Sequence, residues 1–536
     1  MQATVIQYIF LILLILGFVM LANRLKVAYP IVLVLGGLVL SFTDTFSHIT
    51  IDPDLVFFIF LPPLLYEAAW QTSWKEFYRW RRVIMSFAFP IVIITSIVVA
   101  FVSNALIPGF TLALGFLLGG IISPPDAISA TTIMRRVDVP KSLMSIIEGE
   151  SLLNDASSLI VFRFALASVV TGQFHLREAT GNFFLVIALG TAIGLALGLV
   201  FYAIHRWLPT TTSIEIVLTL VTPYCMYYAA EHFHVSGVLA VVSGGLFLSN
   251  KRQSMMNYRS RIEGVNVWTN IVFVLNGLVF LLIGLQLPTI VEQLGGIGLR
   301  TAILYGLAIS VVLIIVRLLC TLGASLFTTF ISRFITVADA NPGWKGPLIS
   351  GWAGMRGVVS LAAALSVPEY ISGDEPFPLR SLILFITFVV ILVTLVLQGL
   401  TLPWVIRKVN MEDRYSKISE AEQEKIIQKK IAHYSLEYLT AKYGNTPSGN
   451  THLNNLYERL ALDLAYFNQA LEDEKQTTKS GLGDFQEAYL GLLEFQRNLL
   501  AEMNRRTEFD EDLIRKYLGL IDLEEFKLRE KLVRNG

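Results

Sequence analysis

Thirteen apolar segments occupy most of the first 410 residues of the chain. Most are close to the roughly 20 residues that a helix needs to cross a hydrocarbon core of about 30 Å. They cover residues 4–22, 27–42, 54–69, 83–107, 110–134, 143–171, 182–207, 214–231, 235–249, 266–290, 301–335, 345–367 and 380–406. Because a chain in lipid must satisfy its backbone polar groups within helices or closed barrels, the sequence predicts an all-α polytopic membrane protein of about thirteen transmembrane helices.

The last part of the chain, residues 411–536, has a different composition. It holds 23 acidic and 18 basic side chains, which leaves 19 acidic and 24 basic ones in residues 1–410. Its Leu, Phe and Tyr residues recur at helical spacing, so we expect amphipathic helices that pack together. The sequence therefore predicts a transmembrane domain over 1–410 and a small helical cytosolic domain over 411–536. The net charges are therefore 24 − 19 = +5 for residues 1–410 and 18 − 23 = −5 for residues 411–536, and neither suggests a nucleic-acid partner.

The basic residues indicate how the chain crosses the bilayer. They gather in every second loop, at 24–26, 74–82, 135–141, 205–206, 250–261, 333–345 and 406–408. The alternate loops are acidic or neutral, at 43–54, 103–110, 287–296 and 368–376. Since basic loops stay in the cytoplasm, this pattern predicts an odd number of spans, with the N-terminus outside and the C-terminal domain in the cytoplasm.

Two apolar segments are interrupted at corresponding places. The stretch 119–132 contains Pro124 and Pro125, which remove two backbone donors and so break a helix. The stretch 351–360 has three glycines at Gly-x-x-Gly spacing, seven segments further along the chain. Glycines at this spacing can serve only close helix packing. Together with the proline break, however, they favour a transporter built from inverted repeats, with an ion site where two interrupted helices cross.

Acidic and polar residues inside these segments form the candidate site. Asp155 and Ser151 are four residues apart on one helix face, and Asn154 lies on the adjacent strip. Glu67 and Asp126 each follow a Pro-Pro pair in other segments. Such oxygen ligands suit a small dehydrated cation, which Asp155, Glu67 and Ser151 would coordinate, and they suit a proton equally well. No cofactor is expected.

The remaining buried charges have simpler interpretations. We expect Glu150 and Arg356 to form a fixed ion pair between two segments, because a lone arginine at that depth would lack a neutralising partner. Glu148 and Arg163 lie toward opposite ends of one segment, where both side chains can reach the membrane surface.

Four motifs resemble those of the monovalent cation:proton antiporter-1 family, the sodium/proton exchangers. They are LPPLLYEA (61–68), SPPDAISATT (123–132), GESLLNDASSLIVF (149–162) and GWAGMRGVVSLAAAL (351–365). The resemblance runs in order over about 400 residues, through LVLQGLTLPWVI at 395–406. It implies two broken helices that cross in the core, and a homodimer in the inner membrane of the cell.

The resemblance also implies roles for the site residues. The pair Asn154 and Asp155 matches the transport signature, in which the aspartate binds cation and proton in turn. Residues matching Glu67, Asp126 and Ser151 form or support the ion site. Those matching Glu150 and Arg356 are structural. One departure is Pro125, which stands where many members have the threonine of Thr-Asp-Pro, so that side-chain role does not transfer.

The expected function is antiport of a monovalent cation against protons by alternating access. Na⁺ is favoured, with K⁺ or Li⁺ as alternatives. Asparagine in place of a second aspartate at position 154 fits one proton per cation and an electroneutral cycle. A cation channel or a K⁺ efflux protein would use the same acidic residues without needing one alternating carboxylate. An intramembrane aspartyl protease would need Gly-x-Gly-Asp contexts inside its membrane segments. The chain has this pattern at 481–484, in its charged C-terminal part, and not in the apolar segments of residues 1–410, so no enzyme activity is expected.

Overall fold

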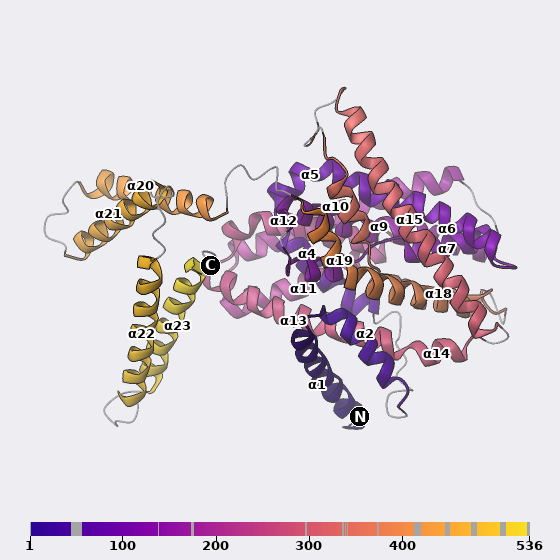
Figure 1. Cartoon of the computed structure of the whole chain (residues 1–536), viewed down its shortest axis with the longest axis horizontal. Helices are drawn as coiled ribbons and strands as arrows, with labels where there is room; N and C mark the ends of the chain where they lie inside the picture. The colour runs from indigo at the N-terminus through magenta and orange to yellow at the C-terminus, as the bar shows by residue number, and fades with distance from the viewer. Residues whose placement is uncertain are drawn as a thin grey trace. The chain divides into compact units, whose positions relative to one another are not determined.

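The computed structural model separates the chain into two compact units, Met1–Asp413 and Arg414–Gly536. It describes residues 2–43, 56–137, 139–172, 176–294, 297–334, 337, 339, 341–371, 375–411, 420–444, 451–472, 480–503 and 511–532. The first unit is a bundle of membrane-type helices and the second carries four further helices (Figure 1). The boundary lies three residues beyond the division at 410 that composition predicts.

The helices of the first unit follow the apolar segments. The first half comprises α1 (Gln2–Leu25), α2 (Tyr29–Leu40), η1 (Val56–Phe60), α4 (Leu61–Gln71), α5 (Trp74–Ser86), η2 (Phe87–Ile91), α6 (Val92–Leu106), α7 (Leu112–Ile122), α8 (Ala127–Met134) and α9 (Lys141–Thr171). The second half comprises α10 (Leu176–Trp207), α11 (Thr212–His232), α12 (Gly237–Met255), α13 (Tyr258–Leu285), α14 (Leu287–Glu292), α15 (Leu299–Ile331), α16 (Lys345–Trp352), α17 (Val358–Leu365), α18 (Arg380–Val393), η3 (Thr394–Gln398) and α19 (Gly399–Val409).

Each of the thirteen predicted segments coincides with a helix or with consecutive helices in the described part of the chain. By length and composition, eight of these stretches can cross a membrane, and α1 and α2 contribute shorter apolar helices. The all-helical, polytopic fold class is thereby confirmed, whereas the number of thirteen spans stays a prediction. The first two residues of the segment 54–69 and most of the acidic loop 43–54 lie outside the described residues.

Both interrupted segments are broken where the sequence predicts. The helix α7 ends at Ile122 and α8 begins at Ala127, because the prolines between them cannot continue the hydrogen-bond ladder. The helix α16 ends at Trp352 and α17 begins at Val358, across the glycine-rich stretch. The two breaks meet, since the backbone N–H of Asp126 donates to the carbonyl oxygen of Met355 at 2.7 Å.

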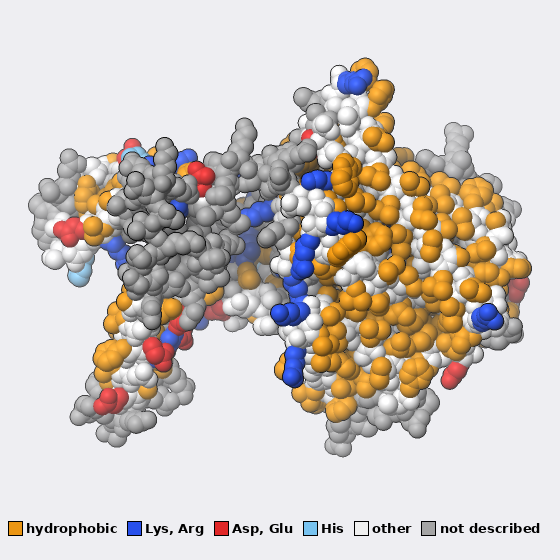
Figure 2. All heavy atoms as spheres, viewed as in Figure 1, with side chains coloured by type: hydrophobic (Ala, Val, Ile, Leu, Met, Phe, Trp, Pro, Cys, Tyr) orange, Lys and Arg blue, Asp and Glu red, His pale blue; other side chains and the backbone are white. Residues whose placement is uncertain are grey.

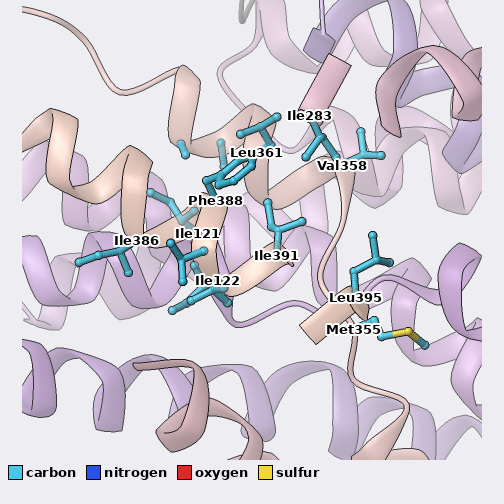
Figure 3. Close-up of a cluster of buried hydrophobic side chains, with 14 of the residues drawn as sticks. Ile121, Ile122, Ile283, Met355, Val358, Leu361, Ile386, Phe388, Ile391 and Leu395 are labelled. Carbon is cyan, nitrogen blue, oxygen red and sulfur yellow. The ribbon is translucent and has the colours of Figure 1, made fainter. Parts of the chain in front are cut away.

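Apolar side chains enclose this crossing. Figure 3 shows Ile121 and Ile122 from the end of α7 close to Leu361 of α17 and to Phe388 and Ile391 of α18. All five belong to one core cluster and are at most 3% exposed. Such packing keeps water from most of the two breaks, so the polar groups there must find partners within the protein.

The outer surface of the first unit is apolar. In α15, Leu304, Val311 and Ile315 are each at least half exposed, as expected of a lipid-facing stripe. Figure 2 shows hydrophobic side chains covering this face, with Lys and Arg side chains gathered along one edge of it. A multi-pass membrane protein requires such a surface.

The second unit consists of two helical hairpins. The helix α20 (Glu420–Tyr443) packs on α21 (Thr451–Glu472), and α22 (Ser480–Met503) packs on α23 (Glu511–Leu532). In the second hairpin, Arg497 bridges the helices through Asp522, at 2.7 Å, and Glu525. The sequence-based expectation of packed amphipathic helices agrees with these hairpins.

Candidate functional site: the crossing of the two broken helices

Asp126 organises the first break. As the N-cap of α8, its carboxylate accepts hydrogen bonds from the backbone N–H groups of Ile128 (3.1 Å) and Ser129 (3.3 Å) and from the Ser129 hydroxyl (2.6 Å). An acidic N-cap satisfies free N–H groups and complements the positive end of the helix dipole. Gly357 of the second break approaches closely, since a Cβ there would lie 2.6 Å from Oδ2 of Asp126.

Two side chains of α9 hold the same break from the other side. The Ser151 hydroxyl accepts a hydrogen bond from the N–H of Ala127 at 3.3 Å. One turn further, the Asn154 amide donates to the carbonyl oxygen of Pro125 at 3.4 Å. Because Asp155 is four residues from Ser151 and directly follows Asn154, it lies on the patch of α9 that faces the break.

The Asp155 carboxylate differs from the others in having no protein donor. Asp155 is 7% exposed, and within the described part of the chain its carboxylate accepts no hydrogen bond. Its charge interacts with that of Asp126. The Oδ1 atom of Asn154 is also fully buried without a hydrogen-bond partner among the described residues. Two free acceptors beside a second carboxylate form a suitable place for a proton or a small cation, because a buried negative charge needs a positive partner.

Arg356 neutralises the helix ends at the crossing. Its Nε donates to the carbonyl oxygen of Ile122 (2.8 Å) and its Nη2 to that of Ser123 (3.1 Å), while Nη1 donates to Gly354. These are free carbonyls at the C-terminal end of α7 and in the second break, where the helix dipole is negative. Arg356 itself is fully buried.

The predicted ion pair between Glu150 and Arg356 is wrong, because Glu150 pairs with a different arginine. Glu150 contacts Arg317 of α15, with Nη1–Oε1 at 2.8 Å and Nη2–Oε2 at 3.1 Å, and both side chains are at most 3% exposed. Arg356 lies near enough to interact with the charge of Glu150, but its hydrogen bonds go to carbonyl oxygens. The pair therefore ties α9 to α15 and leaves Arg356 to stabilise the crossing.

Glu67 lies apart from this group. Its carboxylate accepts a hydrogen bond from Gln71 and interacts with the charges of Arg135 and Glu148. Glu148 is seven residues before Asp155, two turns away on the same face of α9. The structure thus brings Asp126, Ser151 and Asn154 together at the first break, with Asp155 on the same patch of α9. It places Glu67 near Arg135 and Glu148 instead.

Sequence reasoning missed Arg317, although a signal was present. It is the only charged side chain in the apolar stretch 301–332, and such an arginine requires an acidic partner. Thr394 of η3 was also missed. Its hydroxyl accepts a hydrogen bond from the N–H of Arg356 at 3.2 Å, and nothing in the sequence distinguishes it from other apolar-segment threonines.

A helical membrane protein in which two broken helices cross beside a buried, unpartnered carboxylate belongs to the class of secondary transporters. Comparison with known proteins narrows this class. The family model for the sodium/hydrogen exchanger, transmembrane part, matches residues 10–408. The chain therefore belongs to the sodium/hydrogen exchanger family.

Individual relatives agree. A protein named as an uncharacterized Na⁺/H⁺ exchanger in Mycobacterium tuberculosis is 30% identical over 517 residues, which cover 95% of this chain and 93% of that relative. The sodium, potassium, lithium and rubidium/H⁺ antiporter of Bacillus pumilus is 35% identical over 71% of this chain and 58% of its own length. The fold is similar to that of the sodium proton antiporter MjNhaP1 from Methanocaldococcus jannaschii, with a TM-score of 0.59 at 18% identity, covering 76% of this chain and 99% of MjNhaP1.

Proposed function

We propose that this protein exchanges a monovalent cation, Na⁺ in the first place, for protons across the membrane. Family membership supports the reaction, and the observation that carries the assignment of the site is the buried Asp155 carboxylate, which has no protein hydrogen-bond donor in the described residues. K⁺ or Li⁺ as the transported ion is an open alternative, because the related antiporter of Bacillus pumilus is named for sodium, potassium, lithium and rubidium.

Asp155 binds the two substrates in turn. A proton or a cation neutralises its charge, and the nearby charge of Asp126 disfavours the state in which neither is bound. Ser151 and Asn154 supply neutral oxygens on the same patch of α9. Because the site can hold one species at a time, and because the empty charged site is costly to move, each reorientation carries one ion for the other.

Glu67 and Glu148 complete the proposed path. Glu148 lies two turns from Asp155 on α9, and Glu67 of α4 interacts with the charges of Glu148 and Arg135. They attract cations toward the site without binding them permanently, since Arg135 offsets part of their charge. The single alternating carboxylate supports one proton per cation, which is an electroneutral cycle.

The proposal also covers the orientation of the protein in the membrane and its oligomeric state. Basic side chains along one edge of the apolar surface support a cytoplasmic location for that edge (Figure 2). The alternation of basic and acidic loops along the chain supports an N-terminus outside and a cytoplasmic second unit. The inner membrane and a homodimer follow from the family resemblance alone. No nucleic-acid partner and no cofactor belong to the proposal.

Asp155→Asn tests the assignment. The substitution removes the titrating charge and changes the volume little, so the protein should insert and fold but lose cation-dependent proton movement. The measurement is proton movement in proteoliposomes on addition of Na⁺, K⁺ or Li⁺ in turn. Glu263→Gln, which breaks an exposed pair with Arg259 within α13, is the matched control and should exchange normally. Normal exchange by Asp155→Asn would contradict the proposed site, and cation flux without proton movement by the wild type would instead indicate a channel.

A further inference from the structure

The helices of the first unit pack as two groups. We call α5 to α9 and α15 to α19 the core group, because they pack mainly on one another and contain both broken helices and Asp155. We call α1, α2, α4 and α10 to α13 the scaffold group, because these helices also pack mainly among themselves. Contacts between the groups are sparse and involve chiefly α9 with α4 and α12, and α13 with α17.

One ion pair joins the two groups within the described residues. Nη2 of Arg163, on α9 of the core group, donates to Oε1 of Glu231 at 2.8 Å and to Oε2 at 2.6 Å, and Glu231 is on α11 of the scaffold group. The backbone N–H of Gly237, at the start of α12, also donates to Oε1 of Glu231 at 3.2 Å. The N–H of Gly237 holds the Glu231 carboxylate in place on the scaffold group, and both carboxylate oxygens accept hydrogen bonds from Arg163.

The pair lies on one side of the ion site. Arg163 follows Asp155 by eight residues, about 12 Å along α9. Glu148, with Arg135 at 4.0 Å, lies on the other side of Asp155. At the end of α8 on that other side, the acceptors of Arg136 among the described residues are neutral oxygens of the scaffold, at Val27 and Asn23. The ion pair between the groups therefore lies on the Arg163 side, which the loop charges place toward the outside. On the other side, Glu67 of α4 interacts with the charges of Arg135 and Glu148 without forming an ion pair among the described residues.

We propose that Arg163 and Glu231 form a latch that closes the Arg163 side of the ion site and that separates in every transport cycle. This inference rests on the proposed exchange by alternating access. Alternating access moves one helix group against the other around the site, so a contact that ties the groups beside the site cannot persist in both states. The pair of Glu150 with Arg317 lies wholly inside the core group and stays intact throughout.

The latch shifts the balance between the two states. Glu231→Gln weakens it and raises the population of the state open on the Arg163 side. The apparent Michaelis constant for the cation should then fall on that side and rise on the other, each about two- to fivefold, as expected from an ion pair of modest strength. A merely structural loss would lower the maximal rate and leave the two constants unchanged. The matched control is Glu369→Gln, which removes an acidic partner of Arg380 within the core group.

A reversible cross-link gives the decisive measurement. Arg163→Cys and Glu231→Cys, combined with Cys225→Ser and Cys320→Ser, place thiols on both groups, and both positions are accessible to reagent, with side chains 45% and 29% exposed. Linking them with a bifunctional methanethiosulfonate should stop exchange, and dithiothreitol should restore it. The same treatment of Glu369→Cys with Arg380→Cys, in the same background, should leave exchange unchanged.

Each outcome bears on the latch. Normal exchange by the linked 163–231 protein would overturn it, as would equal shifts of both Michaelis constants in Glu231→Gln. If the double-cysteine protein does not exchange before linking, the two Michaelis constants of Glu231→Gln decide alone. Failure of the proposed function itself looks different, because wild-type protein would then move no protons on cation addition.

Discussion

At the scale of single residues, Glu150 and Arg317 show what a buried charge demands in this protein. Both side chains are nearly inaccessible, so each charge has given up its hydration and depends on the other. Nη2 of Arg317 donates a hydrogen bond to Oε2 of Glu150 at 3.1 Å, and Nη1 lies 2.8 Å from Oε1 as an ion-pair contact. Loss of either partner leaves the other charge uncompensated.

We expect Glu150→Gln and Arg317→Met each to lower the free energy of unfolding by about 3–5 kcal/mol. The double variant should be less destabilised than the sum of the singles, because no unpaired charge remains. Denaturant titration in mixed micelles measures all three values. Arg259→Met with Glu263→Gln, an exposed pair four residues apart on α13, is the control and should leave the free energy of unfolding nearly unchanged. Additive losses at 150 and 317 would show that the contact stabilises nothing.

Spacing along one helix was enough to predict part of the site. Ser151, Asn154 and Asp155 share a patch of α9 because 3.6 residues make a turn, and that patch does meet the first break. The partner of Glu150 could not be predicted in the same way. Arg317 and Arg356 lie in different segments, and the sequence does not show how far each of them is from Glu150 in the folded protein. Only the packing of α15 against the core decides which arginine reaches the acid.

At the scale of helices, the two breaks were predictable because their causes are local. Prolines end α7, and glycines interrupt the path from α16 to α17. The contact between the breaks was not predictable in detail, because the close approach of Gly357 to Asp126 depends on how the two segments cross. The π-helical turns η2 and η3 were also missed. Pro90 inside η2 is a signal for the first, whereas no residue of η3 marks the second.

Gly357→Ala should slow exchange. The added Cβ would lie 2.6 Å from Oδ2 of Asp126, so the two breaks must separate by several tenths of an ångström. A shift of this kind at an ion site should lower the exchange rate about tenfold or more. Initial rates in proteoliposomes at equal protein give the comparison.

Gly323→Ala is the matched control for this change. Gly323 lies within α15, and a Cβ there meets no atom within 4 Å. Alanine is the better helix former by about 1 kcal/mol, so this variant should keep its rate and its stability. Wild-type rates in Gly357→Ala would mean that the crossing tolerates a wider separation than its contacts suggest.

At the scale of the whole molecule, the residues of the ion site belong to the first unit alone. All site residues lie before Asp413, and the second unit begins at Arg414. The end of the first unit is held locally, because Nζ of Lys345 donates to the carbonyl oxygen of Asn410 at 2.9 Å. Truncation after Asp413 keeps this contact and removes the second unit entirely.

This separation leads to a prediction about pH. With one shared carboxylate, protons compete with the cation, so lowering pH on the cation-binding side should raise the apparent Michaelis constant for the cation. The rise should reach about tenfold per pH unit once the pH lies below the proton affinity of the site, with a nearly constant maximal rate at saturating cation. Above that pH the constant should level off, and turnover should fall as returning protons become scarce.

The dependence of the apparent Michaelis constant on pH should be the same after truncation at Asp413, because Asp155 and its neighbours remain in the shortened chain. A pH sensor in the second unit would act differently, by changing the maximal rate while leaving the slope of the Michaelis constant untouched. Titrating the cation at several pH values, on the full chain and on the truncated chain, separates the two effects. A Michaelis constant independent of pH in the full chain would rule out exchange through a single carboxylate, since proton and cation would then no longer be competing for Asp155.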